Sequence, residues 1–228
     1  MNMSSRDEIE DQQDPPDRES SVVRELLSAT VPEADQAPIS QLVIRDLAVA
    51  SIALAVFGGA HSWAELSDLT IAHSAVAFVG LIVGALLAGV GHEWGHLAGA
   101  RLAGGHCPTS SLKAFPELFR FDFANNDRRA FIWLTAGGSV GHWAVTFLLL
   151  ISLPFASLGT SALIASAVGV SVLVTLADFP IAKAASEGKT VRQAYTAVPG
   201  NFVKHYGPQA LAAALVTFLV VLLSPQLS

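Results

Sequence analysis

Charged residues are scarce in this sequence of 228 residues: only 14% are Asp, Glu, Lys or Arg, while 52% are hydrophobic. A soluble domain of this size carries about 25% charged residues. The mean hydropathy of +0.50 also favours a chain that lies in a membrane. We therefore expect an integral membrane protein in contact with the lipid bilayer.

The chain has only one cysteine, Cys107, which excludes an internal disulfide and a four-cysteine zinc module. Its first forty residues lack the apolar run that a secretory signal needs. Positions 1–38 hold 10 acidic and 3 basic residues, whereas the remainder holds 9 acidic and 10 basic residues. We expect residues 1–42 to form a disordered, acidic, cytosolic tail, and residues 43–228 to form the transmembrane domain.

Long apolar runs predict an all-α membrane protein, a polytopic bundle of about five transmembrane helices. The predicted spans cover residues 47–63, 72–100, 130–156, 161–180 and 208–223. A polar connector, residues 101–129, separates the second span from the third. Within it, Phe119, Phe121 and Phe123 alternate with polar residues, which predicts a short strand or an interfacial segment.

The positions of the basic residues predict the orientation. All 13 lysines and arginines fall ahead of the first span, in the connector, or between the fourth and fifth spans. Because basic loops stay on the cytosolic side, we expect a cytosolic N-terminus and an outer C-terminus. We expect a multi-pass protein of a prokaryotic cell membrane.

The second span contains HEWGH, from His92 to His96, which fits the pattern H-E-x-x-H. Helical residues four apart lie on one face, so both histidines can hold one metal ion while Glu93 takes a proton from water. The same face continues through glycine and alanine, which let neighbouring helices approach closely in a membrane. The histidines should therefore point into the bundle. The alternative is two buried histidines that bond their neighbours, with Glu93 reaching the interface.

A hydrolytic zinc site needs three protein ligands, and Asp178 is the best candidate for the third. It is the only carboxylate in the last three predicted spans. It precedes Lys183 by as many residues as His96 precedes Arg101, so it should lie at the depth of the histidines. The alternative is a helix-end aspartate paired with Lys183, an end that Pro180 would mark.

The stretch HEWGHLAGARLAGG resembles the site-2 protease family, zinc metalloproteases that cut within the membrane. The family pattern H-E-x-x-H-x-x-x-A is matched with Ala100 at its last position. A weaker match is Gly138-Ser139-Val140-Gly141-His142, where the family has Gly-Pro-x-x-Asn. Another partial match is Leu176-Ala177-Asp178, where the family has an Asn-Pro and Leu-Asp-Gly stretch that carries its aspartate ligand. The likeness covers about residues 79–184, a three-helix core.

The resemblance implies a Zn²⁺-dependent intramembrane endopeptidase with a three-helix metalloprotease core. Zinc would be held by His92, His96 and Asp178, and Glu93 would activate the water. Its substrates would be transmembrane helices of other membrane proteins. Gly138 and His142 would contact the substrate or the oxyanion. His142 could instead replace Asp178 as a ligand, or bond within a helix loosened by glycine.

Two other functions stay open: a catalytically inactive relative of that family, and a small metal-binding or metal-transport protein. A transporter is expected to carry polar groups along several spans. His106 and Cys107 follow two glycines, and we interpret them as loop residues outside the metal site. We expect no nucleic-acid partner, and the sequence does not indicate an oligomeric state.

Overall fold

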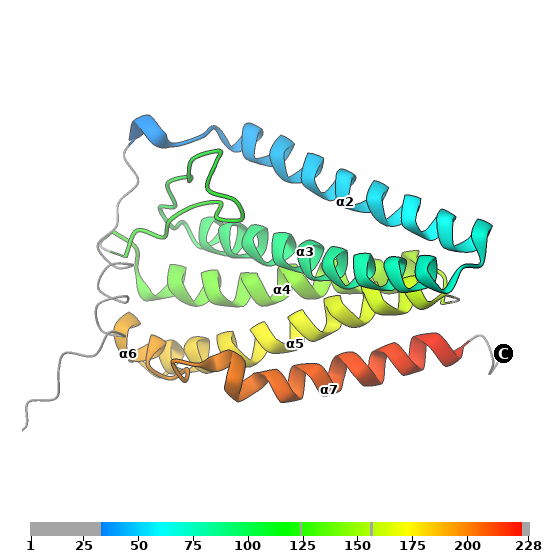
Figure 1. Ribbon diagram of the computed structural model, residues 1–228. Coiled ribbons are helices and arrows are strands. Elements are labelled where there is room, and N and C mark those ends of the chain that lie inside the picture. Colours follow the sequence, from blue (N-terminus) through cyan, green and yellow to red (C-terminus); the bar gives the residue numbers. More distant parts are fainter. Residues whose placement is uncertain (1–32, 124, 156, 225–228) are drawn as a thin grey trace, which may run out of the picture.

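The protein is described by a computed structural model that covers residues 33–123, 125–155 and 157–224. Over these ranges it is a helical bundle (Figure 1). The five long helices are α2 (Ile39–Ser67), α3 (Thr70–Leu102), α4 (Arg128–Ser152), α5 (Leu158–Ser186) and α7 (Phe202–Leu223). A 3-10 turn, η1 (Glu33–Asp35), and a short helix, α6 (Val191–Tyr195), complete the described elements. Each long helix is long and apolar enough to cross a membrane, which confirms the predicted bundle of five spans.

Several helix ends differ from the predicted spans. Helix α5 continues through Pro180 to Ser186, and α7 begins at Phe202, ahead of Pro208. Proline removes one backbone donor, but a helix packed among others tolerates it. Helix α4 ends at Ser152, short of the predicted end at residue 156. Pro180 therefore does not mark a helix end.

The tail boundary also moves. Helix α2 begins at Ile39, so residues 39–42, which we assigned to the tail, are helical. The disorder expected of residues 1–32 lies outside the described residues.

Polar side chains cap three of the long helices where their apolar sequence begins. The Asp127 carboxylate accepts a hydrogen bond from the Ala130 amide at the start of α4 (2.8 Å). Ser157 caps α5, and Asn201 caps α7. A side-chain cap satisfies an amide that has no partner within the helix, so these residues set where the helices start.

Helix α3 lies at the centre of the bundle and contacts α2, α4 and α5. Helix α5 in turn contacts α3, α4 and α7. Figure 1 shows α2 and α7 on opposite outer sides of this three-helix group. The metal-site candidates therefore belong to the inner helices.

Glycines let the backbones of α3 and α4 touch. A Cβ atom on Gly95 would lie 2.9 Å from the Cα atom of Gly141, and one on Gly91 would lie 2.9 Å from the Gly141 carbonyl oxygen. Gly99 packs in the same way on the backbone of Trp133. Such close contact is typical of small residues at the interface of membrane helices.

A second small-residue face of α3 packs on α5. A Cβ atom on Gly80 would lie 2.6 Å from the Gly159 carbonyl oxygen, and one on Gly84 would lie 3.0 Å from the Leu163 carbonyl carbon. Ala88, one turn further along this face, is fully buried. This is the face that the sequence predicts to carry the histidines, and it points into the bundle as expected.

The connector between α3 and α4 forms no strand within its described residues. Its only pairing of that kind is an isolated bridge between Thr109 and Phe119. The alternation of phenylalanines reflects packing instead, because Phe119 and Phe121 are buried while Arg120 between them is exposed. The connector also holds the start of α2, where the Thr109 hydroxyl donates to the Ala37 carbonyl (2.7 Å).

Candidate metal centre

His92 and His96 lie one turn apart on α3 with their rings in contact. Their Nε2 atoms are 2.8 Å apart. The His96 Nδ1–H donates to the Leu134 carbonyl at 2.7 Å. Since a carbonyl can only accept, this bond leaves the His96 Nε2 lone pair available as a ligand. A ligating histidine normally uses its second nitrogen in this way.

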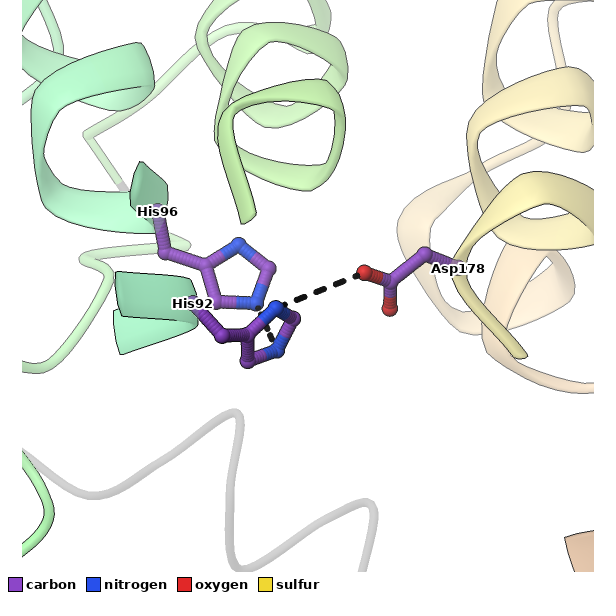
Figure 2. Close-up of side chains that lie close together, drawn as sticks. All are labelled: His92, His96 and Asp178. Carbon is purple, nitrogen blue, oxygen red and sulfur yellow. Dashed lines mark hydrogen bonds and ion pairs between the residues drawn. The ribbon is translucent and has the colours of Figure 1, made fainter. Parts of the chain in front are cut away.

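Asp178 approaches the histidine pair from α5. Its Oδ2 atom lies 3.9 Å from the Nδ1 atom of His92, and only 13% of its side chain is exposed. Figure 2 shows the carboxylate pointing across the space between the helices toward the two rings. The Ser139 hydroxyl of α4 donates to the same oxygen at 3.5 Å.

The alternative pairing of Asp178 with Lys183 is not found. The Lys183 ammonium instead lies 4.0 Å from the carboxylate of Glu187, the residue that follows the last residue of α5. Asp178 lies within α5, which ends at Ser186. The prediction that Asp178 comes close to the histidines is therefore confirmed.

Together these three residues could hold a metal ion. One ligand atom from each lies within 4.8 Å of the others. Two imidazoles and one carboxylate form a donor set that zinc uses in hydrolytic sites, with one position left open. Tetrahedral bonds of about 2.0–2.1 Å place two nitrogen ligands roughly 3.3 Å apart. The 2.8 Å between the two histidine Nε2 atoms is shorter than this spacing, and the 3.9 Å from His92 to Asp178 is longer, so binding an ion would require the side chains to shift.

Glu93 stands on α3 beside His92 and is partly buried. Its carboxylate interacts electrostatically with the carboxylates of Glu117 in the connector and Asp46 in α2. It also interacts electrostatically with the carboxylate of Asp178, so Glu93 lies near the candidate triad as well as near the connector and α2. Glu93 thus places a carboxylate next to the candidate ligand His92, but it is not one of the three residues of the triad.

A contact that the sequence did not reveal joins α2 to α3, the helix that carries the candidate histidines. The Trp94 indole N–H, inside HEWGH, donates to the Asp46 carboxylate at 2.8 Å. Arg45 binds the other oxygen of Asp46 at 2.7 Å, and Asp46 is only 5% exposed. The only signal in the sequence was an adjacent Arg-Asp pair at the start of an apolar run.

His142 is completely buried on α4 beside the triad. Its Nδ1 atom lies 3.3 Å from the Nδ1 atom of His92, and its Nε2 atom lies 3.0 Å from the Thr175 hydroxyl. The Trp143 indole N–H donates to the same hydroxyl at 2.9 Å. His142 is therefore a neighbour of His92, while Asp178 is the residue that joins the two histidines in the candidate group.

Gly138 lies directly against the His96 ring. A Cβ atom at this position would lie 2.6 Å from Nδ1 and 2.7 Å from Nε2 of that ring. The backbone of Gly138 also interacts with the ring of His92. Only glycine leaves room for the imidazole here, so Gly138 shapes the candidate metal site itself. Its expected contact with substrate stays a prediction.

The contact between α4 and α5 carries a polar ladder of three hydrogen-bonded pairs. From one pair to the next, the position on α4 advances by three and then by four residues, while the position on α5 goes back by the same numbers. The pairs are Ser139–Asp178 (3.5 Å), His142–Thr175 (3.0 Å) and Thr146–Ser171 (2.9 Å). The ladder starts at the candidate metal ligand and runs away from it into the apolar part of the bundle.

His106 and Cys107 lie in the connector and take no part in the triad. The His106 Nδ1 atom is 3.1 Å from the Asp122 carboxylate. Burial raises the pKa of the Cys107 thiol to about 11, despite an opposing effect of Arg101. A thiol that stays protonated is a poor metal ligand, since the thiolate is the ligating form.

The sequence matches no protein-family model, and neither a curated protein nor a solved structure was found to be similar to it. The function must therefore be argued from the geometry of this site.

Proposed function

We propose that the protein is a zinc-dependent intramembrane endopeptidase that resembles the site-2 protease family. The observation that carries the proposal is the convergence of His92, His96 and Asp178 from two helices that could span a membrane. Ionisable groups are costly inside a bilayer and normally serve a function there. Their types match the three protein ligands of a catalytic zinc site.

When bound, zinc lowers the pKa of water toward neutrality and polarises a peptide carbonyl. The protein supplies the remaining chemistry. Glu93, adjacent to His92, accepts a proton from the attacking water and then donates it to the leaving amine. His96 is held by the Leu134 carbonyl, and Asp178 is held by Ser139. These bonds fix the ligands before the reaction, so little reorganisation is needed.

The location of the triad supports a peptide substrate that crosses the bilayer. His96 lies five residues before Arg101 on α3, which places it roughly 7–8 Å inside the basic end of that helix. The proposed mechanism requires water to reach Glu93 from this end, which we assign to the cytosol of a prokaryotic cell. The substrate would be a transmembrane helix of another protein, and it must unwind because a helical peptide bond is shielded by its own hydrogen bonds.

The test is a Glu93→Gln variant, which keeps the shape of the side chain and removes its basicity. We expect it to bind zinc as the wild type does and to cleave a transmembrane-helix peptide in proteoliposomes about 10²- to 10⁴-fold more slowly. Glu65→Gln, a change of an exposed glutamate in α2, is the matched control. Normal cleavage by Glu93→Gln would show that the proposed mechanism is wrong.

A second candidate function, metal transport, has one observation in its favour. The polar ladder continues beyond the triad through two further pairs, His142–Thr175 and Thr146–Ser171. Zinc transport by the protein in sealed vesicles, without peptide cleavage, would favour this alternative. An inactive relative would show neither activity.

A further inference from the structure

The proposed zinc site accounts for the first pair of the polar ladder but not for the second. His142 has no exposed surface, and a buried imidazole needs partners for both nitrogens. It finds them in the Nδ1 atom of His92, 3.3 Å away, and the Thr175 hydroxyl, 3.0 Å away. The second pair therefore contacts the proposed ligand His92 through the ring nitrogen that does not face His96.

The hydrogen bonds of the histidine pair indicate which nitrogen of His92 would bind the metal. His96 uses Nδ1 for the Leu134 carbonyl, so its ligand atom is Nε2. The nitrogen of His92 closest to that atom is its own Nε2, at 2.8 Å. If Nε2 is the ligand atom of His92, Nδ1 carries the ring hydrogen and needs an acceptor.

The His142 Nδ1 atom lies within hydrogen-bond distance of the His92 Nδ1 atom, at 3.3 Å, whereas the Asp178 carboxylate is 3.9 Å away. The Gly138 backbone also interacts with the His92 ring, and His142 is the side chain suited to be the acceptor. If its Nδ1 atom accepts from His92, its Nε2–H must donate, and Thr175 lies on that side. The Thr175 oxygen has two lone pairs, so it can also accept from the Trp143 indole N–H at 2.9 Å. The ring N–H groups of His92 and His142 and the indole N–H of Trp143 then each have an acceptor.

We propose that His142 and Thr175 are positioning residues that orient His92 for metal binding. This inference rests on the proposed function. Neither residue is assigned to bind zinc or touch substrate. Thr175 holds His142 in the tautomer that accepts from His92, and this bond orients the ligand ring and raises its basicity. The third pair of the ladder, Thr146–Ser171, bonds within itself and has no described hydrogen bond to a proposed ligand.

The experiment compares zinc affinities of the full-length protein in detergent, measured by competition with a chelator of known affinity. Thr175→Val keeps the size of the side chain and removes the acceptor. We expect its zinc affinity to fall about 10- to 100-fold, the usual effect of losing an outer hydrogen bond to a ligand. Thr175→Ser keeps the hydroxyl and should restore an affinity close to that of the wild type.

Thr146→Val is the matched control, because it makes the same change in the pair next along the ladder. Its zinc affinity should equal that of the wild type, even if its thermal stability falls. Wild-type affinity in Thr175→Val would overturn the inference, as would happen if the Gly138 backbone alone oriented His92. Equal losses in Thr175→Val and Thr146→Val, or no rescue by Thr175→Ser, would also overturn it. A wild-type protein without zinc would instead overturn the proposed function.

Discussion

At the scale of single residues, the candidate metal site depends on the hydrogen bonds that hold each proposed ligand in place. The Leu134 carbonyl fixes His96, and the Ser139 hydroxyl supports Asp178. Both partners come from α4, a helix that supplies no member of the triad. The site therefore needs three helices, although two of them carry its proposed ligands.

Removal of the Asp178 side chain tests whether this residue binds the metal or only lies near the histidines. We expect Asp178→Ala to lose zinc affinity by more than about 100-fold, which exceeds the usual effect of an outer-shell change. The measurement is zinc content of purified protein by atomic emission, followed by chelator competition.

The matched control for this prediction is Glu187→Ala, which removes a half-exposed carboxylate from the end of the same helix. Zinc binding should stay unchanged in that variant. Full zinc content in Asp178→Ala, with loss in a His142→Ala variant, would show that His142 is the third ligand.

At the scale of helices, the approach of α3 to α4 depends on glycine. Gly95 meets the backbone of α4, whereas Gly89 on the same helix has open space where a Cβ atom would be. Substitution by alanine should therefore lower the stability of the fold at Gly95 but not at Gly89.

We expect Gly95→Ala to destabilise the fold by about 1–3 kcal/mol, because the two backbones must move apart. Gly89→Ala should be neutral or stabilising by up to about 1 kcal/mol, because alanine is the better helix former. Thermal unfolding in detergent, followed by circular dichroism, measures both. Similar effects of the two changes would contradict the tight contact between α3 and α4.

Helix boundaries show the limit of reading elements from the sequence. The existence of five spans followed from apolar length, which is a local property. Their ends did not, because Pro180 and Pro208 lie inside helices that neighbouring helices hold together. The alternation of phenylalanines in the connector predicted a strand. It instead reflects the burial of Phe119 and Phe121 in a segment whose described residues form only one isolated bridge.

At the scale of the whole molecule, the metal should link α3 to α5 and so stabilise the bundle. A ligand that binds only the folded state adds about 2.7 kcal/mol at a concentration 100 times its dissociation constant. We therefore expect a chelator to lower the unfolding temperature of the wild-type protein, and added zinc to restore it. Thermal scans with and without chelator measure the difference.

The same scans on Asp178→Ala provide the control, since a protein that has lost the site should not respond to the chelator. A response of equal size in that variant would mean that the chelator acts elsewhere. The exposed histidines near chain turns, His73 and His106, are the first alternative sites to test in that case.

The sequence by itself determined the membrane-spanning class, the number of long helices and the candidates for the triad. These follow from apolar length, from the four-residue spacing within one helix, and from the matching depth of Asp178. Only the tertiary structure decided that Asp178 faces His92, that Gly138 makes room for His96, and that Thr175 supports His142. The reason is physical: periodicity gives the face and depth of a residue on its own helix, but the rotation and approach of neighbouring helices depend on how all of them pack together.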